Sequence, residues 1–237
     1  MSNVFIGAIG LSLFAVPVAG QLSSQAADSS PIPADVQRAV AELPDGRMQR
    51  PGSLDAMTPA QVKYVEGILD GPRNAISGPL VVMLQSPELG DLAQRTMAYA
   101  RYAGTQGFAS VPPRLNEIAV IMAAREWSSP YVWNAHHRYA VSVGVPAELV
   151  EAIRTGSAAP ENLQPDVAAV YAFLDELLQT RQVSDATFAA ARNALGGDRQ
   201  VVDLIGTFAI YQMSAMLTAV DRTGLADGQQ PALRPLE

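Results

Sequence analysis

Prolines and glycines divide most of this 237-residue chain into segments whose lengths suit helices. Pairs such as Thr58-Pro59, Ser86-Pro87 and Ser129-Pro130 place a capping side chain directly before a proline, which is a typical start of an α-helix. Glycines such as Gly144 and Gly156 are typical helix ends. The expected helices cover residues 59–69, 87–102, 113–127, 130–143, 146–155, 165–180, 185–195 and 198–220.

The sequence gives little support to a β-sheet, because no run of alternating apolar and polar residues is flanked by hairpin turns. We therefore predict an all-α fold, with one helical domain over residues 59–225. Residues 28–58 are rich in proline and contain one short helix-like patch at 34–43, so we expect a linker or an N-terminal arm. Residues 226–237 are expected to form a C-terminal tail.

The N-terminus resembles a targeting segment. Residues 5–19, FIGAIGLSLFAVPVA, are uncharged and apolar, and a polar stretch with small residues follows. This pattern predicts a signal peptide over residues 1–27, cleaved after Gly20 or Ala27, and an exported protein, periplasmic or secreted. A retained anchor or an ordinary N-terminal helix are the alternatives, because MSNV carries no Lys or Arg. The run is shorter than the ~20 residues of a membrane-spanning helix, so no stable span is expected in the mature protein.

Charge and composition limit the function classes. The formal charge is −7 and no cluster of Lys and Arg offsets it, which disfavours nucleic acid as a partner. The chain has no cysteine, which excludes thiol peroxidase, disulfide and thiolate-metal chemistry. Its two histidines are adjacent, so the other ligands of any metal would have to be carboxylates. We therefore predict neither a metal nor a cofactor.

The apolar pattern of the expected helix at 113–127 predicts that it carries a buried acidic residue. Residues 118–124 are seven consecutive apolar residues, so this helix is expected to be buried on every side. Glu117 shares a face with Ile121 and Ala124, which directs its carboxylate into a poorly hydrated space where it must be paired, hydrogen-bonded or protonated. The alternative is a first-turn Glu that interacts with the helix dipole.

Both histidines lie in the stretch SPYVWNAHH. His136 lies on the core-facing stripe of its helix with Val132 and Ala140, whereas His137 is rotated by about 100°. The two neighbours therefore cannot share one role. A hydrogen-bonded core histidine is the structural alternative for His136.

Residues 112–153, PPRLNEIAVIMAAREWSSPYVWNAHHRYAVSVGVPAELVEAI, resemble the carboxymuconolactone decarboxylase family of the alkylhydroperoxidase D-like superfamily. The resemblance extends more loosely over residues 50–220, and VVDLIGTFAIYQMSAM resembles a second copy of the unit without a histidine. It implies a helical bundle of two related repeats, the first carrying the site. The residues that match the family in order and spacing are Glu117, Arg125, Trp127, Tyr131, Trp133, His136 and Gly144.

One departure from the superfamily decides against redox chemistry. The related alkylhydroperoxidase D group carries a Cys-x-x-Cys motif whose positions fall on Ser129 and Val132 here. A hydroxyl and an isopropyl group form neither a thiolate nor a disulfide. Ser129 is also an ordinary helix cap before Pro130, so it has either a structural or a chemical role.

The resemblance implies an enzyme without a cofactor that acts on a small unsaturated lactone or carboxylic acid. In that interpretation His136 donates a proton and Glu117 orients it or relays the proton. Tyr131 and Trp133 would form an aromatic wall, and Arg73 or Arg125 would hold a substrate carboxylate. Core packing for the aromatic residues and structural ion pairs for the arginines are the alternatives.

Assembly and reaction type follow from the resemblance alone. It implies a homo-oligomer, a trimer or a multiple of one, because family members place their sites near subunit contacts. Another lyase, an isomerase or a hydrolase on the same scaffold is an alternative, since a scaffold does not determine the reaction. A non-catalytic exported binding protein is a second alternative.

Overall fold

The computed structural model describes residues 32–41, 43, 45–51, 56–73, 75–102, 111–225 and 229–233. The predicted signal peptide lies outside this range, and export and oligomerisation stay predictions. Within the described residues every regular element is helical, which confirms the all-α fold. The elements are α1 (Ala34–Val40), α2 (Pro59–Leu69), α3 (Pro79–Val82), the 3₁₀ helix η2 (Met83–Gln85), α4 (Pro87–Tyr102), α5 (Pro113–Glu126), α6 (Pro130–Ser142), α7 (Ala147–Thr155), α8 (Pro165–Thr180), α9 (Asp185–Leu195) and α10 (Asp198–Asp221).

Local capping explains why the helices begin where the sequence predicts. The Thr58 hydroxyl accepts a hydrogen bond from the Gln61 amide (3.2 Å), and the Gln61 side chain accepts one from the Thr58 amide (2.9 Å), so α2 opens with a capping box. Ser129 caps α6 through a 3.3 Å hydrogen bond from the Val132 amide. Gly156 ends α7 in the left-handed conformation, at a φ of 71°.

The sequence analysis predicted no element over residues 79–85, where the structure has α3 and η2. Leu80 to Leu84 are all buried, so this short stretch has no polar face and no helical periodicity. The two helical segments together span only two turns, too short for a periodic pattern to appear.

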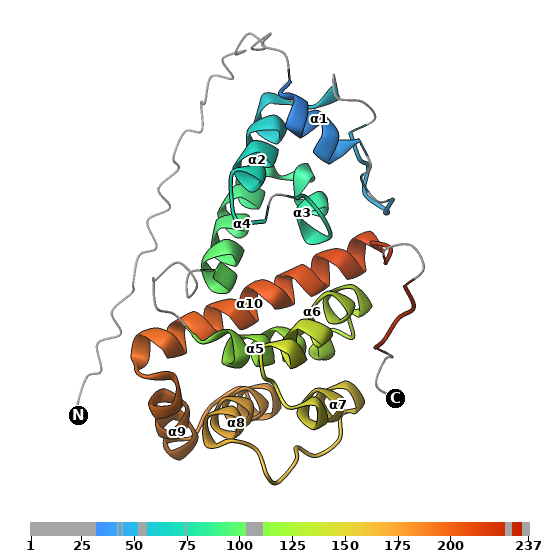
Figure 1. Ribbon diagram of the computed structural model, residues 1–237. Coiled ribbons are helices and arrows are strands. Elements are labelled where there is room, and N and C mark those ends of the chain that lie inside the picture. Colours follow the sequence, from blue (N-terminus) through green and yellow to red (C-terminus); the bar gives the residue numbers. More distant parts are fainter. Residues whose placement is uncertain are drawn as a thin grey trace, which may run out of the picture. The chain divides into compact units, whose positions relative to one another are not determined.

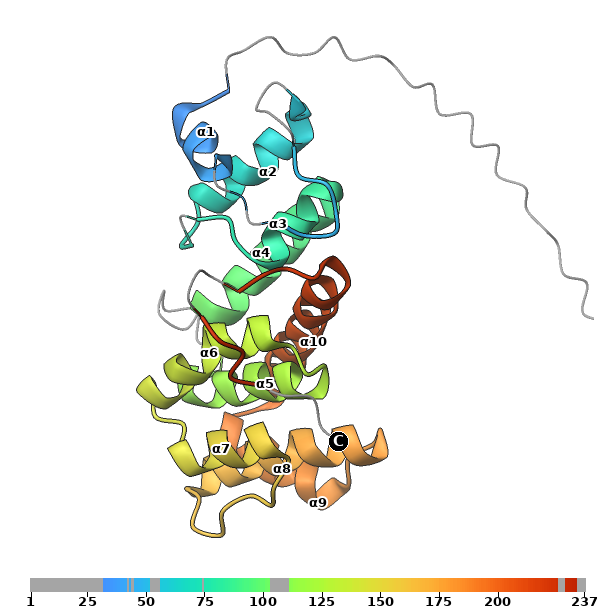
Figure 2. The ribbon, with the colours of Figure 1, turned by 90° about the vertical axis from the view of Figure 1, so that its right-hand side faces the viewer.

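Two hydrophobic clusters meet at α10, which runs between α1–α4 and α5–α9 in Figure 1 and lies beside α5 and α6 in Figure 2. One face of α10 packs Ile210, Met213 and Leu217 against the cluster formed by α1–α4. Leu204 and Phe208 belong to the cluster formed by α5–α10. The long helix therefore joins the two clusters.

By length and composition, α10 is also the one helix in the described ranges that is apolar enough to cross a membrane. Its packing against α5, α4, α3 and α6 accounts for the apolar residues on the faces turned to the two cores. Other apolar residues of α10, among them Val202 and Val220, are exposed.

The segment before α2 is attached to the C-terminal end of α10. Asp221, fully buried, accepts hydrogen bonds from the Arg50 guanidinium (3.1 and 2.7 Å) and from the Met48 amide (2.9 Å). The Arg47 amide donates to the Asp221 carbonyl (2.6 Å). Residues 45–51 thus form an arm held by a buried carboxylate.

The described part of the C-terminal tail runs along α6. The Asn134 side chain donates to the Gln230 carbonyl (2.9 Å) and accepts from the Ala232 amide (3.0 Å). Leu233 is buried in the cluster of α5–α10.

Candidate acid–base site

The first turn of α5 carries a buried carboxylate, as its sequence pattern predicts. Glu117 is only 2% exposed, and every residue of α5 from Leu115 to Arg125 is buried. Its neighbour Asn116 fixes this turn, because it donates to the Ala100 carbonyl at the end of α4 (3.0 Å) and accepts from Thr207 of α10 (2.8 Å). Two other helices, α4 and α10, therefore hold the turn that carries Glu117.

His136 of α6 meets this carboxylate. Its Nδ1 lies 2.8 Å from Oε2 of Glu117, and the imidazole is 6% exposed. The ring of Tyr211 on α10 packs edge-to-face on it at a centroid distance of 4.9 Å. Since Glu117 occupies Nδ1, Nε2 is the nitrogen left for chemistry, and within the described residues it has no hydrogen-bond partner.

His137 has a different environment, as the rotation between neighbouring helical positions requires. Its Nδ1 lies 2.9 Å from the Trp133 carbonyl, and its ring stacks on Trp133 at 6.1 Å and an interplanar angle of 8°. A carbonyl oxygen only accepts, so this Nδ1 donates. The contacts of His137 are therefore those of a structural residue.

A cavity of about 100 Å³ opens beside His136. The loop before α3, α3, α4, α6 and α10 all contribute to its wall. The lining consists of Arg73, Ser77, Pro79, Leu80, Met97, Arg101, Tyr131, Val132, Ala135, His136, Tyr211 and Ser214. The pair from the first predicted repeat therefore faces residues of α10, so the site is not formed by that repeat alone.

Tyr131, one of the predicted binding residues, lines this cavity. Burial raises the pKa of its phenol, against a hydrogen bond with Ser77. The backbone of Gly78, at a φ of 53°, passes so close to the Tyr131 ring that a Cβ there would overlap it. Glycine at this position allows the loop before α3 to form the cavity wall.

Arg73, another predicted binding residue, also lines the cavity. Its Nε and Nη2 are buried and have no hydrogen-bond partner among the described residues. The guanidinium lies 5.8 Å from the centroid of the Tyr102 ring. Burial raises the pKa of Tyr211 to about 12, opposed by the charges of Arg101 and Arg73 and by a hydrogen bond from Arg73.

Arg101 and Tyr211 are site residues that the sequence analysis missed. Burial disfavours the charged form of Arg101, but the nearby Tyr211, Tyr102 and Glu117 outweigh burial and raise the pKa of the guanidinium. Arg101 lies in the last turn of α4 and Tyr211 in an apolar run of α10, so no local motif marks either residue.

Two predicted binding residues lie outside this cavity. Trp133 is fully buried in the cluster of α5–α10, where it packs on His137. Arg125 donates to the Arg154 carbonyl (3.0 Å) and to the Ser128 hydroxyl (2.8 Å). Trp133 is one position from the cavity-lining Val132, and Arg125 is two helical turns from Glu117, so helix geometry separates both from the His136 cavity.

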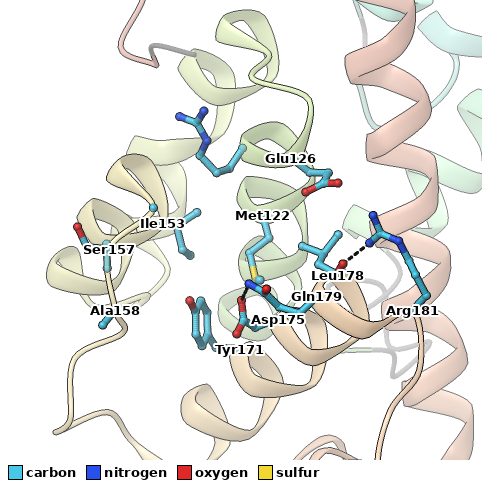
Figure 3. A pocket seen from close by; sticks show the side chains of 13 residues that line it. Met122, Glu126, Ile153, Ser157, Ala158, Tyr171, Asp175, Leu178, Gln179 and Arg181 are labelled. Atoms are coloured by element: carbon cyan, nitrogen blue, oxygen red, sulfur yellow. Dashed lines mark hydrogen bonds between the residues drawn. The ribbon is translucent and has the colours of Figure 1, made fainter. Parts of the chain in front are cut away.

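Arg125 instead lines a separate cavity of about 500 Å³ between the ends of α5 and α7 and one face of α8 (Figure 3). Its wall includes Glu126, Tyr171 and Asp175, and Gln179 donates to Asp175 (3.5 Å). Burial, with repulsion from Arg154, lowers the pKa of Arg125. The arginine thus joins the turn after α5 to the end of α7.

Ser129 is placed as a helix cap. Its hydroxyl accepts from the Val132 amide and lies 3.4 Å from the Thr218 hydroxyl of α10, in a buried position outside the lining of the His136 cavity. These contacts support the structural interpretation of Ser129.

Comparison with known proteins supports the fold and nothing finer. No protein-family model matches the chain, and a search of curated proteins finds no match either. Among solved structures, the chain is similar to an alkylhydroperoxidase AhpD core, an uncharacterized peroxidase-related protein from Ralstonia eutropha JMP134. The TM-score is 0.57 at 14% identity, over 78% of this chain and 95% of the other. The chain therefore has an alkylhydroperoxidase D-like helical fold.

Proposed function

We propose that the protein is an acid–base enzyme of the lyase class that acts on a small unsaturated lactone or carboxylic acid without thiol chemistry. The observation that carries this proposal is the 2.8 Å contact between Glu117 and His136 beside a cavity. The resemblance of residues 112–153 to the carboxymuconolactone decarboxylase family supports the choice of reaction.

Glu117 has the role of a positioning residue. An ionised carboxylate can only accept, so its contact with Nδ1 fixes a protonated Nδ1 and presents Nε2 to the cavity. The same carboxylate stabilises the imidazolium that forms whenever Nε2 takes up a proton. The pair is therefore suited to give and receive a proton at one atom.

The proposed reaction is a decarboxylation. The bond between the substrate carbon and its carboxylate breaks, carbon dioxide leaves, and the electron pair moves into a conjugated carbonyl group. The His136 imidazolium then donates its Nε2 proton to carbon, and solvent restores that proton. Tyr211 and Val132 exclude water from the imidazole during this step.

A panel of small unsaturated carboxylic acids and lactone acids in D₂O tests the proposal. Nuclear magnetic resonance would follow loss of the carboxyl carbon and appearance of a carbon–deuterium bond. We expect both for at least one compound, at a rate that falls 10²-fold or more in His136→Gln. His137→Gln is the matched control and is expected to stay within twofold of wild type.

Each other outcome identifies an alternative. Deuterium incorporation without carbon dioxide would indicate an isomerase that uses the same pair. Binding without either signal would favour a non-catalytic binding protein. Turnover that persists in His136→Gln would exclude the acid–base role of this histidine.

A further inference from the structure

The His136 cavity contains more positive charge than its own residues neutralise. Arg73 and Arg101 both line it, and none of its described lining residues is a carboxylate. Glu117, which contacts Nδ1 of His136, is the carboxylate among the described residues whose charge acts on Arg101. With a neutral imidazole, the two arginines and Glu117 leave one positive charge in excess.

Both guanidinium groups lie against aromatic rings. Arg73 lies 5.8 Å from the Tyr102 ring and Arg101 lies 5.3 Å from the same ring. Arg101 also lies 5.5 Å from the Tyr139 ring. A stacking contact of this kind uses the face of a guanidinium group and not the N–H donors at its edge. One donor of Arg73 is used in the hydrogen bond with Tyr211.

Arg73 has hydrogen-bond donors that are left unused. Its buried Nε and Nη2 have no hydrogen-bond partner among the described residues. A buried donor without a partner is costly, whereas a carboxylate accepts two parallel hydrogen bonds from one guanidinium edge. The cost is recovered when an anion of that shape enters the cavity.

From these observations we infer that Arg73 and Arg101 form an anion-binding subsite that holds a carboxylate of the substrate next to His136. The inference rests on the proposed function and names its substrate class: a small carboxylate. The carboxylate held by the two arginines neutralises this excess charge, and its planar shape matches the guanidinium edge. The volume, about 100 Å³, is smaller than the ~150 Å³ cavity that takes up benzene, so the group bound here is small.

The carboxylate held by the arginines is the one that stays on the molecule. An arginine on a departing carboxylate stabilises the charge that must leave it, and so slows the loss of carbon dioxide. Arg73 and Arg101 therefore orient the substrate, and the reacting carbon lies toward Nε2 of His136.

Binding of but-2-enoate and of its uncharged amide to the full chain tests this subsite without any turnover. Isothermal titration calorimetry is expected to give a dissociation constant at least tenfold lower for the carboxylate. Arg101→Gln and Arg73→Gln should each weaken carboxylate binding tenfold or more and change amide binding less than twofold. Compared with Arg101→Gln, Arg101→Lys should recover part of the lost carboxylate affinity, because lysine keeps the positive charge but lacks the paired N–H donors of the guanidinium.

Arg138→Gln is the control, since Arg138 is an exposed residue of the same helix as His136. Equal affinity for the acid and the amide, no binding of the acid at millimolar concentration, tighter binding of inorganic phosphate, or an equal loss in Arg138→Gln would each overturn the inference. His136→Gln separates it from the proposed function: that variant should bind but-2-enoate while turnover is lost.

Discussion

Glu117 near the start of α5 and Arg125 near its end are both buried charged residues, but their partners differ in kind. Arg125 donates to a backbone carbonyl and a serine hydroxyl, neither of which exchanges a proton near neutral pH. Glu117 contacts an imidazole, which does. The comparison shows that the partner, and not burial alone, separates a candidate catalytic charge from a structural one.

The largest expected effect concerns Glu117. We expect Glu117→Gln to lower turnover 10²-fold or more at nearly unchanged substrate affinity, because the amide keeps the shape but cannot stabilise the imidazolium. Steady-state kinetics would separate kcat from KM, with circular dichroism as the check on folding. An unchanged kcat would make Glu117 a structural residue like Arg125.

Asp221 extends the comparison to a third buried charge. Burial would raise the pKa of its carboxyl, but hydrogen bonds from Arg50, Thr223 and the Met48 amide lower it to about 2. The depressed pKa contributes stability above the ordinary value of 3.8, and this contribution is lost as the pH falls through about 2.

Asp221→Asn should therefore lower the free energy of unfolding by about 3 kcal/mol at pH 7 and flatten its decline between pH 4 and 2. Urea denaturation across this pH range measures both. Asp198→Asn is the control, because Asp198 is exposed in its pair with Arg192. An equal change in both variants would contradict the assigned role of Asp221.

Arg125→Met tests the structural end of α5. We expect a loss of about 2 kcal/mol in the free energy of unfolding, because hydrogen bonds from a buried charged donor disappear. Turnover per folded molecule should stay within twofold, since Arg125 lies outside the His136 cavity. Arg181→Met, at the rim of the same 500 Å³ cavity, should change stability less. A tenfold rise in KM for Arg125→Met would instead indicate that Arg125 contacts the substrate.

The smallest effect is expected at Gly78. Gly78→Ala adds a Cβ that overlaps the Tyr131 ring and strains a positive φ, so Tyr131 must shift and the cavity wall with it. We expect KM to rise three- to tenfold while kcat changes less than twofold. Gly206→Ala on α10 is the control, because its added Cβ meets no described atom within 4 Å apart from its chain neighbours and the backbone of its own helix. Equal kinetics for both variants would show that the wall does not depend on Gly78.

Much of the fold was predictable because helix boundaries are local. Thr58-Pro59, Ser129-Pro130 and Gly156 mark helix ends by their own chemistry. The sequence analysis missed the short helices α3 and η2, because a buried stretch of only two turns has no polar face from which a helix could be predicted.

The site was predictable only in part. Glu117 stands out through the apolar run of its helix and His136 through the resemblance to the carboxymuconolactone decarboxylase family, and the structure places the two side chains in contact. Arg101 and Tyr211 were missed because they are distant in sequence from both and reach the cavity only through the packing of α4 and α10 around α5. Arg125 was expected near the substrate, but its sequence position does not show to which end of α5 the cavity belongs.

The most direct test of the account compares the side-chain nitrogen resonances of the two histidines by ¹⁵N nuclear magnetic resonance. We expect His136 to carry a protonated Nδ1 and a free Nε2 whose resonance shifts when but-2-enoate is added, and Glu117→Gln to change this histidine alone. His137, bound to the Trp133 carbonyl, should respond to neither change. A response of His137 with none at His136 would contradict the assignment of the acid–base pair.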